Sequence, residues 1–218
     1  MLNLKIMVGS TRPGRAADRV MPWIVGRAKN HGAFNVEVLD LRDWPLPFFS
    51  ETLESVGDPR HPTYSEPIVR RWNKCIAEGD AYLFVTPEYN HSVPAVLKNA
   101  IDSVFASFAF RNKAAAFVGY SGGMAAGVRA LEHLAHIAIE AEMVPLRNTV
   151  LLPQVGGAFD ESGEPKNPAT TAAAGNMLDD LAWWAGALQR ARQEAMLPPT
   201  PFRMMAAAEK SHAGKSDH

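Results

Sequence analysis

The chain has 218 residues, of which 47% are hydrophobic and 21% charged, and its formal net charge is −1. This length suits one α/β domain with a sizeable core, and the near-neutral charge excludes an overall basic field that would attract nucleic acid or an anionic membrane. A single cysteine, Cys75, excludes an intramolecular disulfide and a multi-cysteine zinc site, and it fits a reducing, cytoplasmic setting.

Short apolar runs alternate with helical patterns along the chain. The predicted strands span 4–8, 34–39, 81–86, 114–120 and 146–152, and the predicted helices span 16–28, 68–76, 93–105, 128–138 and 174–188. This alternation predicts a three-layer α/β sandwich, with a five-stranded parallel sheet between two layers of helices. Five such units favour the flavodoxin-like strand order 2-1-3-4-5.

Other segments lack a regular pattern. Prolines make 41–65 irregular, and a glycine- and proline-rich loop covers 153–168. Residues 1–192 form one predicted domain, and 193–218 form a tail without a sustained period, whose last dozen residues are expected to be disordered. Single residues also receive expected places: Cys75 and Trp184 in the core, Trp183 toward a partner subunit, and Asp18, Arg19 and Arg27 on a solvated helix face.

The most informative stretch is 80–105, where a strand pattern ends at Pro87 and a helical period begins at Val93. The intervening turn, PEYNHS, therefore lies at the carboxyl end of the sheet, where open α/β folds bind ligands. Backbone groups around Glu88, Tyr89 and Asn90 can satisfy the nitrogens and carbonyls of a flat ring, and Tyr89 can pack against it. The alternative is that Tyr89 and Asn90 only fill and cap the turn.

The segment GSTRPGR (9–15) follows the first predicted strand and is a candidate phosphate loop. Ser10 and Thr11 offer hydroxyls, Arg12 and Arg15 offer planar donors, and the following helix presents unpaired N–H groups. Neither a Walker sequence nor a G-x-G-x-x-G fingerprint is present. A helix N-terminus with solvated arginines explains this segment about equally well.

A third turn, Ser121-Gly122-Gly123, follows the fourth predicted strand. Two adjacent glycines allow a ligand to lie directly against the backbone, although a flexible connection is the better explanation of this turn alone. In a parallel sheet, all three turns open at the same edge.

The three segments in this order resemble the NAD(P)H-dependent FMN reductase family, which includes quinone, azo-dye and chromate reductases on a flavodoxin-like fold. The resemblance covers roughly residues 4–190, and PEYNHS-VP-x-x-LKNAID is its specific part. It implies three sets of FMN contacts: Ser10, Arg12 and Arg15 at the phosphate; Pro87, Glu88, Tyr89 and Asn90 beside the isoalloxazine; and Ser121, Gly122 and Gly123 at its other edge. Family members often have glycine where this chain has Ala95, and a methyl group there is expected to narrow the approach to the flavin.

The resemblance implies an oxidoreductase that transfers hydride from NADPH or NADH through bound FMN to a small acceptor, such as a flavin, quinone, azo compound or metal oxyanion. The flavin carries this chemistry, so no catalytic side chain and no metal are expected. A homodimer or homotetramer is also implied, and the apolar segment 44–49 is expected over the site, over a neighbouring subunit or on its own domain. Two rivals remain: a flavodoxin-type electron carrier without reductase activity, and a flavin-free nucleotide or sugar-phosphate binder.

Overall fold

A computed structural model describes residues 1–58 and 60–213 of the chain. Its parallel strands are β1 (Leu2–Val8), β2 (Phe34–Asp40), β3 (Ala81–Pro87), β4 (Ala114–Tyr120), β5 (Val144–Pro145) and β6 (Val150–Leu152). The order is β2-β1-β3-β4-β5, which confirms the predicted one. Strand β6 also pairs with β4, nearer the carboxyl end of β4 than β5 does. In place of the one strand predicted at 146–152, the structure has two short segments, at 144–145 and 150–152.

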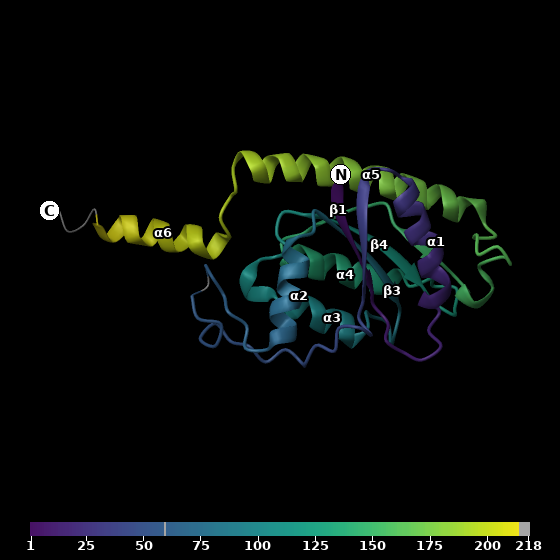
Figure 1. Ribbon diagram of the computed structural model, residues 1–218, viewed down its shortest axis with the longest axis horizontal. Coiled ribbons are helices and arrows are strands. Elements are labelled where there is room, and N and C mark those ends of the chain that lie inside the picture. The colour runs from purple at the N-terminus through teal and green to yellow at the C-terminus, as the bar shows by residue number, and fades with distance from the viewer. Residues whose placement is uncertain (59, 214–218) are drawn as a thin grey trace.

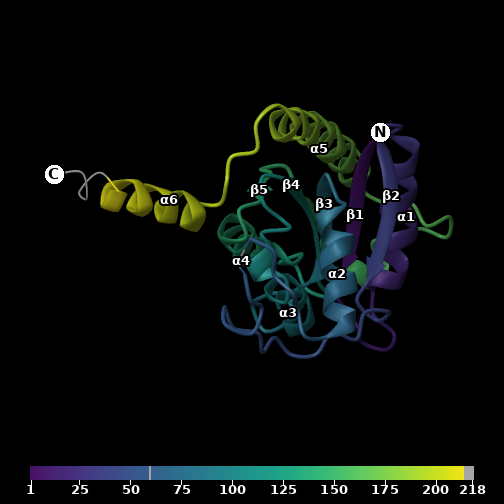
Figure 2. The same cartoon turned by 60° about the vertical axis from the view of Figure 1, so that its left-hand side comes forward.

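Two layers of helices enclose the sheet (Figure 1; Figure 2). Helices α1 (Ala17–Asn30) and α5 (Pro168–Glu194) cover one face, and α2 (Pro67–Ala77), α3 (Ala95–Asp102) and α4 (Val128–Glu140) cover the other. Each face has its own apolar core. Every residue of β3 and β4 is buried, which explains why these strands read as continuous apolar runs rather than alternating ones.

Three helical predictions differ from the structure. The helix expected over 93–105 ends at Asp102 and is followed by a separate 3₁₀ turn, η1 (Phe105–Ser107). Helix α5 begins earlier than expected, at Pro168, because the side chain of Asn167 caps it by accepting the Ala169 N–H. Trp184 is 41% exposed and does not join the core, because Leu181 and Ala185 occupy the buried stripe of α5.

The tail also differs from its prediction. Residues 200–213 form helix α6 where no regular element was expected, and α6 projects away from the sheet in both views (Figure 1; Figure 2). The predicted disorder of the last dozen residues falls partly on this helix, and residues 214–218 lie outside the described part of the chain.

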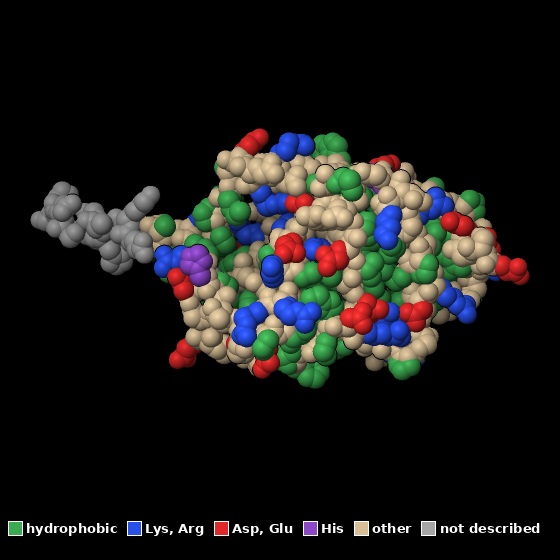
Figure 3. Space-filling view, in the orientation of Figure 1, with side chains coloured by type: hydrophobic (Ala, Val, Ile, Leu, Met, Phe, Trp, Pro, Cys, Tyr) green, Lys and Arg blue, Asp and Glu red, His purple; other side chains and the backbone are tan. Residues whose placement is uncertain are grey.

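Charges of both signs are interspersed over the face shown in Figure 3, in keeping with the net charge of −1. Among the described residues, no helix has the length and apolar character needed to cross a bilayer. Cys75 is buried in the core, as predicted, and burial raises the pKa of its thiol to about 11.

A buried lysine joins several elements at the amino edge of the sheet. Lys113, which immediately precedes β4, is only 7% exposed. Its Nζ donates to the carbonyl oxygens of Ala77 and Ala109, at 2.9 and 2.8 Å, and lies 3.1 Å from the Tyr82 hydroxyl. The pKa of Lys113 is lowered to about 7, mainly by burial and to a smaller extent by repulsion from Arg192.

This shift predicts how stability responds to pH. In the unfolded chain the lysine keeps a pKa of about 10.4, so above pH 7 the unfolded state binds more protons than the folded one. We expect the free energy of unfolding to rise between pH 7.5 and 8.5, by at most about 1.4 kcal/mol per pH unit from this group. Urea denaturation of the wild type and Lys113→Met across this range isolates the contribution of Lys113 as the difference in slope. Equal slopes, or a steeper rise in Lys113→Met, would contradict the prediction.

Candidate functional site

Hydrogen bonds join the predicted turns at the carboxyl edge of the sheet. The Ser10 Oγ and Tyr89 hydroxyl oxygens are 2.8 Å apart, which links the loop after β1 to the turn after β3. The Glu88 N–H donates to the Tyr120 carbonyl at 3.3 Å, which links that turn to the end of β4. The Ser121 N–H donates to the Leu152 carbonyl at 3.2 Å, so the third turn is anchored to β6.

The loop after β1 packs tightly against β3 and α3. A Cβ atom at Gly9 would lie 3.0 Å from a Leu97 methyl carbon and 3.2 Å from Thr86 Oγ1, so only glycine lets the loop pass here without displacement. Ser10 is completely buried. Arg12 lies above the Tyr89 ring, with its Cζ atom 5.5 Å from the ring centroid, in a cation–π arrangement.

Two carbonyl groups of this loop are hydrogen-bonded in the described structure, whereas most of its amide groups are free. Arg15 donates to the Ser10 carbonyl, and Arg42 donates to the Arg12 carbonyl. In contrast, the N–H groups of Ser10–Arg12 and Gly14–Ala17 have no hydrogen-bond acceptor within the described residues. A run of free N–H groups at the start of a helix is typical of an anion-binding loop.

A network of ion pairs lies behind the loop. Arg15 makes a bidentate contact with Asp40, at the end of β2, and its Nε donates to Asp18 at 2.8 Å. Arg42 contacts Asp18 at 3.5 Å, and its N–H donates to Asp40 at 3.0 Å. Burial alone would raise the pKa of Asp40, but hydrogen bonds from Arg15 and Arg42 hold it below its usual value. The resemblance implies that Arg15 contacts the phosphate, yet its guanidinium is already engaged by these partners.

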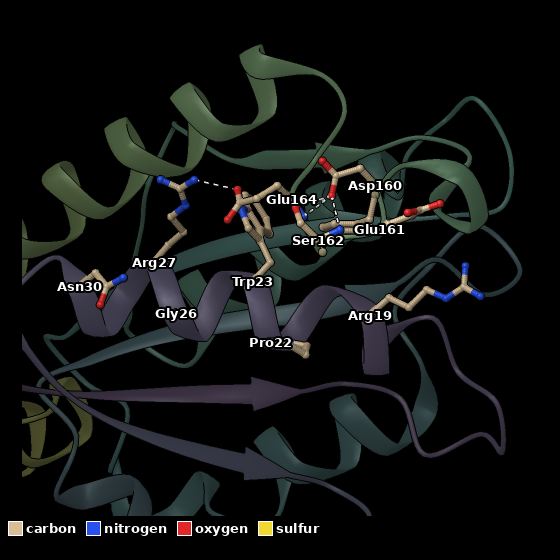
Figure 4. A pocket seen from close by; sticks show the side chains of 12 residues that line it. Arg19, Pro22, Trp23, Gly26, Arg27, Asn30, Asp160, Glu161, Ser162 and Glu164 are labelled. Atoms are coloured by element: carbon tan, nitrogen blue, oxygen red, sulfur yellow. Dashed lines mark hydrogen bonds and ion pairs between the residues drawn. The ribbon is translucent and has the colours of Figure 1, made fainter.

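Asp18, Arg19 and Arg27 lie on a solvent-accessible face of α1, as predicted, and each also bonds to another segment of the chain. Arg19 donates to the Gly156 carbonyl at 2.8 Å, and Arg27 pairs with Glu164 at 2.8 Å (Figure 4). A cavity of about 710 Å³ lies between α1 and the 159–164 loop, lined by these arginines and Trp23. None of the predicted site residues lines it.

The PEYNHS turn is a tight hairpin. The N–H of Tyr89 donates to the Ser92 carbonyl at 2.9 Å, and the Ser92 N–H donates to the Tyr89 carbonyl at 3.1 Å. The two central residues, Asn90 and His91, have φ angles of +48° and +71°. Positive φ at both central positions defines a type I′ turn, in which asparagine is favoured first and glycine second. His91 thus holds a left-handed conformation that costs energy.

Two buried polar groups complete this edge. The Glu88 carboxylate is only 5% exposed and forms an ion pair with Arg129 in the first turn of α4. This pair fixes the turn after β3 against α4. Tyr120, at the end of β4, is 3% exposed, and its hydroxyl has no hydrogen-bond partner among the described residues. Burial raises the pKa of Tyr120, so this hydroxyl keeps its proton and can donate it in a hydrogen bond.

The third turn is open to ligands. An ideal Cβ at Gly122 or Gly123 meets no atom within 4 Å, so empty space lies beside both backbones. Pro87 is buried at the end of β3, whereas Asn90 is exposed. The glycine that starts α4, Gly127, has a different role: its φ is +85°, and a Cβ there would lie 2.7 Å from the Tyr120 nitrogen.

Several residues of the site were missed from the sequence. Asp40, Arg42, Tyr120 and Arg129 are not among the site residues that the sequence predicts. A usable signal existed for Asp40 and Tyr120, since both are polar residues at the carboxyl ends of predicted parallel strands. Arg42 and Arg129 carry no such signal, because their partners are distant in sequence.

The sheet order, with helices on both faces and three loops meeting at the carboxyl edge, defines a flavodoxin-like protein. The family model described as NADPH-dependent FMN reductase matches residues 2–157, and the chain belongs to this family. It is 30% identical to an NAD(P)H-dependent FMN reductase of Pseudomonas aeruginosa over 83% of this chain and 94% of that protein. It is 31% identical to a quinone reductase of Pseudomonas putida, over 84% and 94%.

Solved structures share the fold. A flavoenzyme NAD(P)H:acceptor oxidoreductase of Paracoccus denitrificans superposes with a TM-score of 0.70 and 24% identity, covering 86% of this chain and 98% of that one. The protein is therefore an FMN-dependent oxidoreductase that uses NAD(P)H as its electron donor. The residues present fit FMN, because the free amides and the unpaired Tyr120 hydroxyl offer hydrogen-bond donors at this edge of the sheet, and a phosphorylated flavin needs such donors. The alternative of an electron carrier without reductase activity is not favoured.

The left-handed His91 gives a prediction for stability. Glycine adopts this conformation without steric cost, so His91→Gly should increase the free energy of unfolding by about 1 kcal/mol. The matched control is Ala95→Gly, at the first residue of α3, which should lower it by less than the roughly 0.5–1 kcal/mol that glycine costs inside a helix. Both values come from urea denaturation at one pH. Destabilisation by His91→Gly would show that the histidine side chain contributes more than its backbone costs.

Proposed function

We propose that the loop after β1 binds the FMN phosphate, with the free N–H groups of residues 10–17, the Ser10 hydroxyl and Arg12 as donors. The observation that carries this assignment is the division within the loop: its carbonyl groups at Ser10 and Arg12 are bonded, and its amides are free. Arg12 is exposed and makes no ion pair within the described residues, so its charge is available to a phosphate.

The turns after β3 and β4 are proposed to hold the isoalloxazine ring. Pro87, Glu88, Tyr89 and Asn90 border one edge, and Ser121, Gly122 and Gly123 line the other. The rigid type I′ hairpin and the Glu88–Arg129 pair support this proposal, because they fix backbone donors before any ligand arrives. When bound, FMN supplies the hydride acceptor and donor, and the protein contributes position and hydrogen bonds.

Quinones are the proposed acceptor class, with other small acceptors (flavins, azo compounds and metal oxyanions) as possible additional substrates. The exposed Asn90 and the empty space beside Gly122 and Gly123 leave the site open to flat molecules of modest size. The relatives named quinone reductase, similar over most of the chain, support the same class.

The protein is further proposed to act in the cytoplasm as a homodimer or homotetramer. A mostly apolar groove of about 460 Å³ runs between α3 and α4, lined by residues that include Phe105, Phe108 and Ile137. Trp183 is exposed on α5, which agrees with its predicted place toward a partner.

The segment 44–49 is partly packed on its own domain: Trp44 contacts Trp72, and Phe49 contacts Phe105. A monomeric mass at micromolar concentration, with FMN bound and activity intact, would contradict this assembly.

Purified protein loaded with FMN should oxidise NADPH or NADH faster when 1,4-benzoquinone is added, because the quinone takes up the hydride equivalent. The decrease in absorbance of the pyridine nucleotide measures the rate, and protein without quinone is the control. Consumption of NAD(P)H that does not respond to the quinone would exclude this acceptor class. A lack of NAD(P)H consumption under all conditions would contradict the reductase function itself.

Arg12→Ala should weaken FMN binding by about tenfold, because one charge-assisted hydrogen bond to the phosphate is lost. Riboflavin, which lacks the phosphate, should bind the variant and the wild type almost equally. Fluorescence titration of the apoprotein with each flavin measures both dissociation constants. Equal losses for FMN and riboflavin would show that Arg12 does not act through the phosphate.

A further inference from the structure

We infer that Arg15 is a positioning residue rather than a phosphate ligand: together with Asp40 it holds the Ser10 carbonyl away from the phosphate site, so that the peptide between Ser10 and Thr11 presents its N–H group to the anion. This inference rests on the proposed assignment of the loop after β1. It changes the expected role of one residue and adds another, Asp40, to the flavin-binding machinery.

The geometry leaves Arg15 little to offer a ligand. The Arg15 side chain is 5% exposed, and all three of its nitrogens are engaged. Nη1 donates to the Ser10 carbonyl and to Asp40 at 2.7 Å, Nη2 donates to Asp40, and Nε donates to Asp18 at 2.8 Å. A phosphate contact would require breaking an ion pair in a buried position, which is costly because it leaves a carboxylate without its partner.

The orientation of the Ser10 carbonyl explains why the loop needs the Arg15–Asp40 pair, hereafter the clamp. A carbonyl oxygen directed at a phosphate repels it, whereas an N–H group attracts it. A guanidinium bonded to this carbonyl holds the peptide between Ser10 and Thr11 in one orientation, and the N–H of Thr11 belongs to the same peptide plane. Fixing the carbonyl therefore also fixes an amide that is free of any acceptor within the described residues.

Asp40 is the other half of the clamp. It comes from the end of β2, and its bidentate contact orients the planar guanidinium toward Ser10. Arg42 makes a similar pair of contacts at the same loop: it donates to the Arg12 carbonyl and to Asp18. The end of β2, the start of α1 and the loop thereby form one preorganised unit.

The two roles of Arg15 make opposite predictions for Asp40→Asn. If Arg15 positions the loop through Asp40, this variant should bind FMN about tenfold more weakly, and riboflavin nearly as well as the wild type does. If Arg15 contacts the phosphate itself, removal of the nearby negative charge should leave FMN binding unchanged or make it tighter. Arg15→Lys keeps the charge but not the planar fork, so the positioning role predicts a similar loss for FMN in this variant.

Fluorescence titration of the apoproteins with FMN and with riboflavin gives the ratio of affinities on which the inference depends. The matched controls are Arg27→Lys and Glu164→Gln, which alter another arginine–carboxylate pair of α1 outside the site and should leave both affinities unchanged (Figure 4). Retained riboflavin binding shows that each variant is folded.

Three results would overturn the inference. The first is unchanged or tighter FMN binding by Asp40→Asn, and the second is an equal loss of FMN and riboflavin, which indicates a purely structural role. The third is a wild-type protein that binds FMN no better than riboflavin. This last result would also refute the proposed phosphate loop, whereas the first two would leave it intact.

Discussion

The parallel pairing of β1, β3 and β4 is the constraint on which the site depends. Val8 pairs with Val85, and Val85 with Val118, so the loops that follow these strands begin at nearly the same level of the sheet. Because β3 and β4 are buried on both faces, a shift of register would disrupt two apolar cores at once. The sheet therefore fixes where the three loops meet, whatever their own flexibility.

The loops add a second constraint, because hydrogen bonds within the protein fix the orientation of their backbone groups before any ligand binds. In the loop after β1, side chains bond the Ser10 and Arg12 carbonyls, and the amides are left without acceptors. In the turn after β3, two mutual hydrogen bonds hold a left-handed backbone, and the ion pair between the buried Glu88 carboxylate and Arg129 anchors the turn to α4. Both arrangements lower the stability of the fold in order to fix the shape of a binding edge, as is expected where strain and buried charge occur at functional sites.

Much of this arrangement can be read from the sequence, because apolar runs and helical periods report burial directly. Strand order, the two helical layers and the three converging turns follow from such patterns. The exposure of Trp184 and the presence of α6 do not, since Trp184 falls on the apolar period of α5 although it is exposed, and the tail that contains α6 has no sustained period. The partner of Arg15 was also beyond reach, because Asp40 lies 25 residues away and only the folded sheet brings the two together.

The position of Lys113 separates two kinds of pH response in this protein. It precedes the first residue of β4, and the site begins after the last, so about 20 Å of extended strand lies between them. Over that distance the lysine contacts none of the described groups at the proposed flavin edge, and its Coulomb interaction with charges there is several-fold weaker than at contact distance. A pH–rate profile of the enzyme should thus report the groups around the flavin and its substrates, even in the range where the same solution changes the stability of the fold.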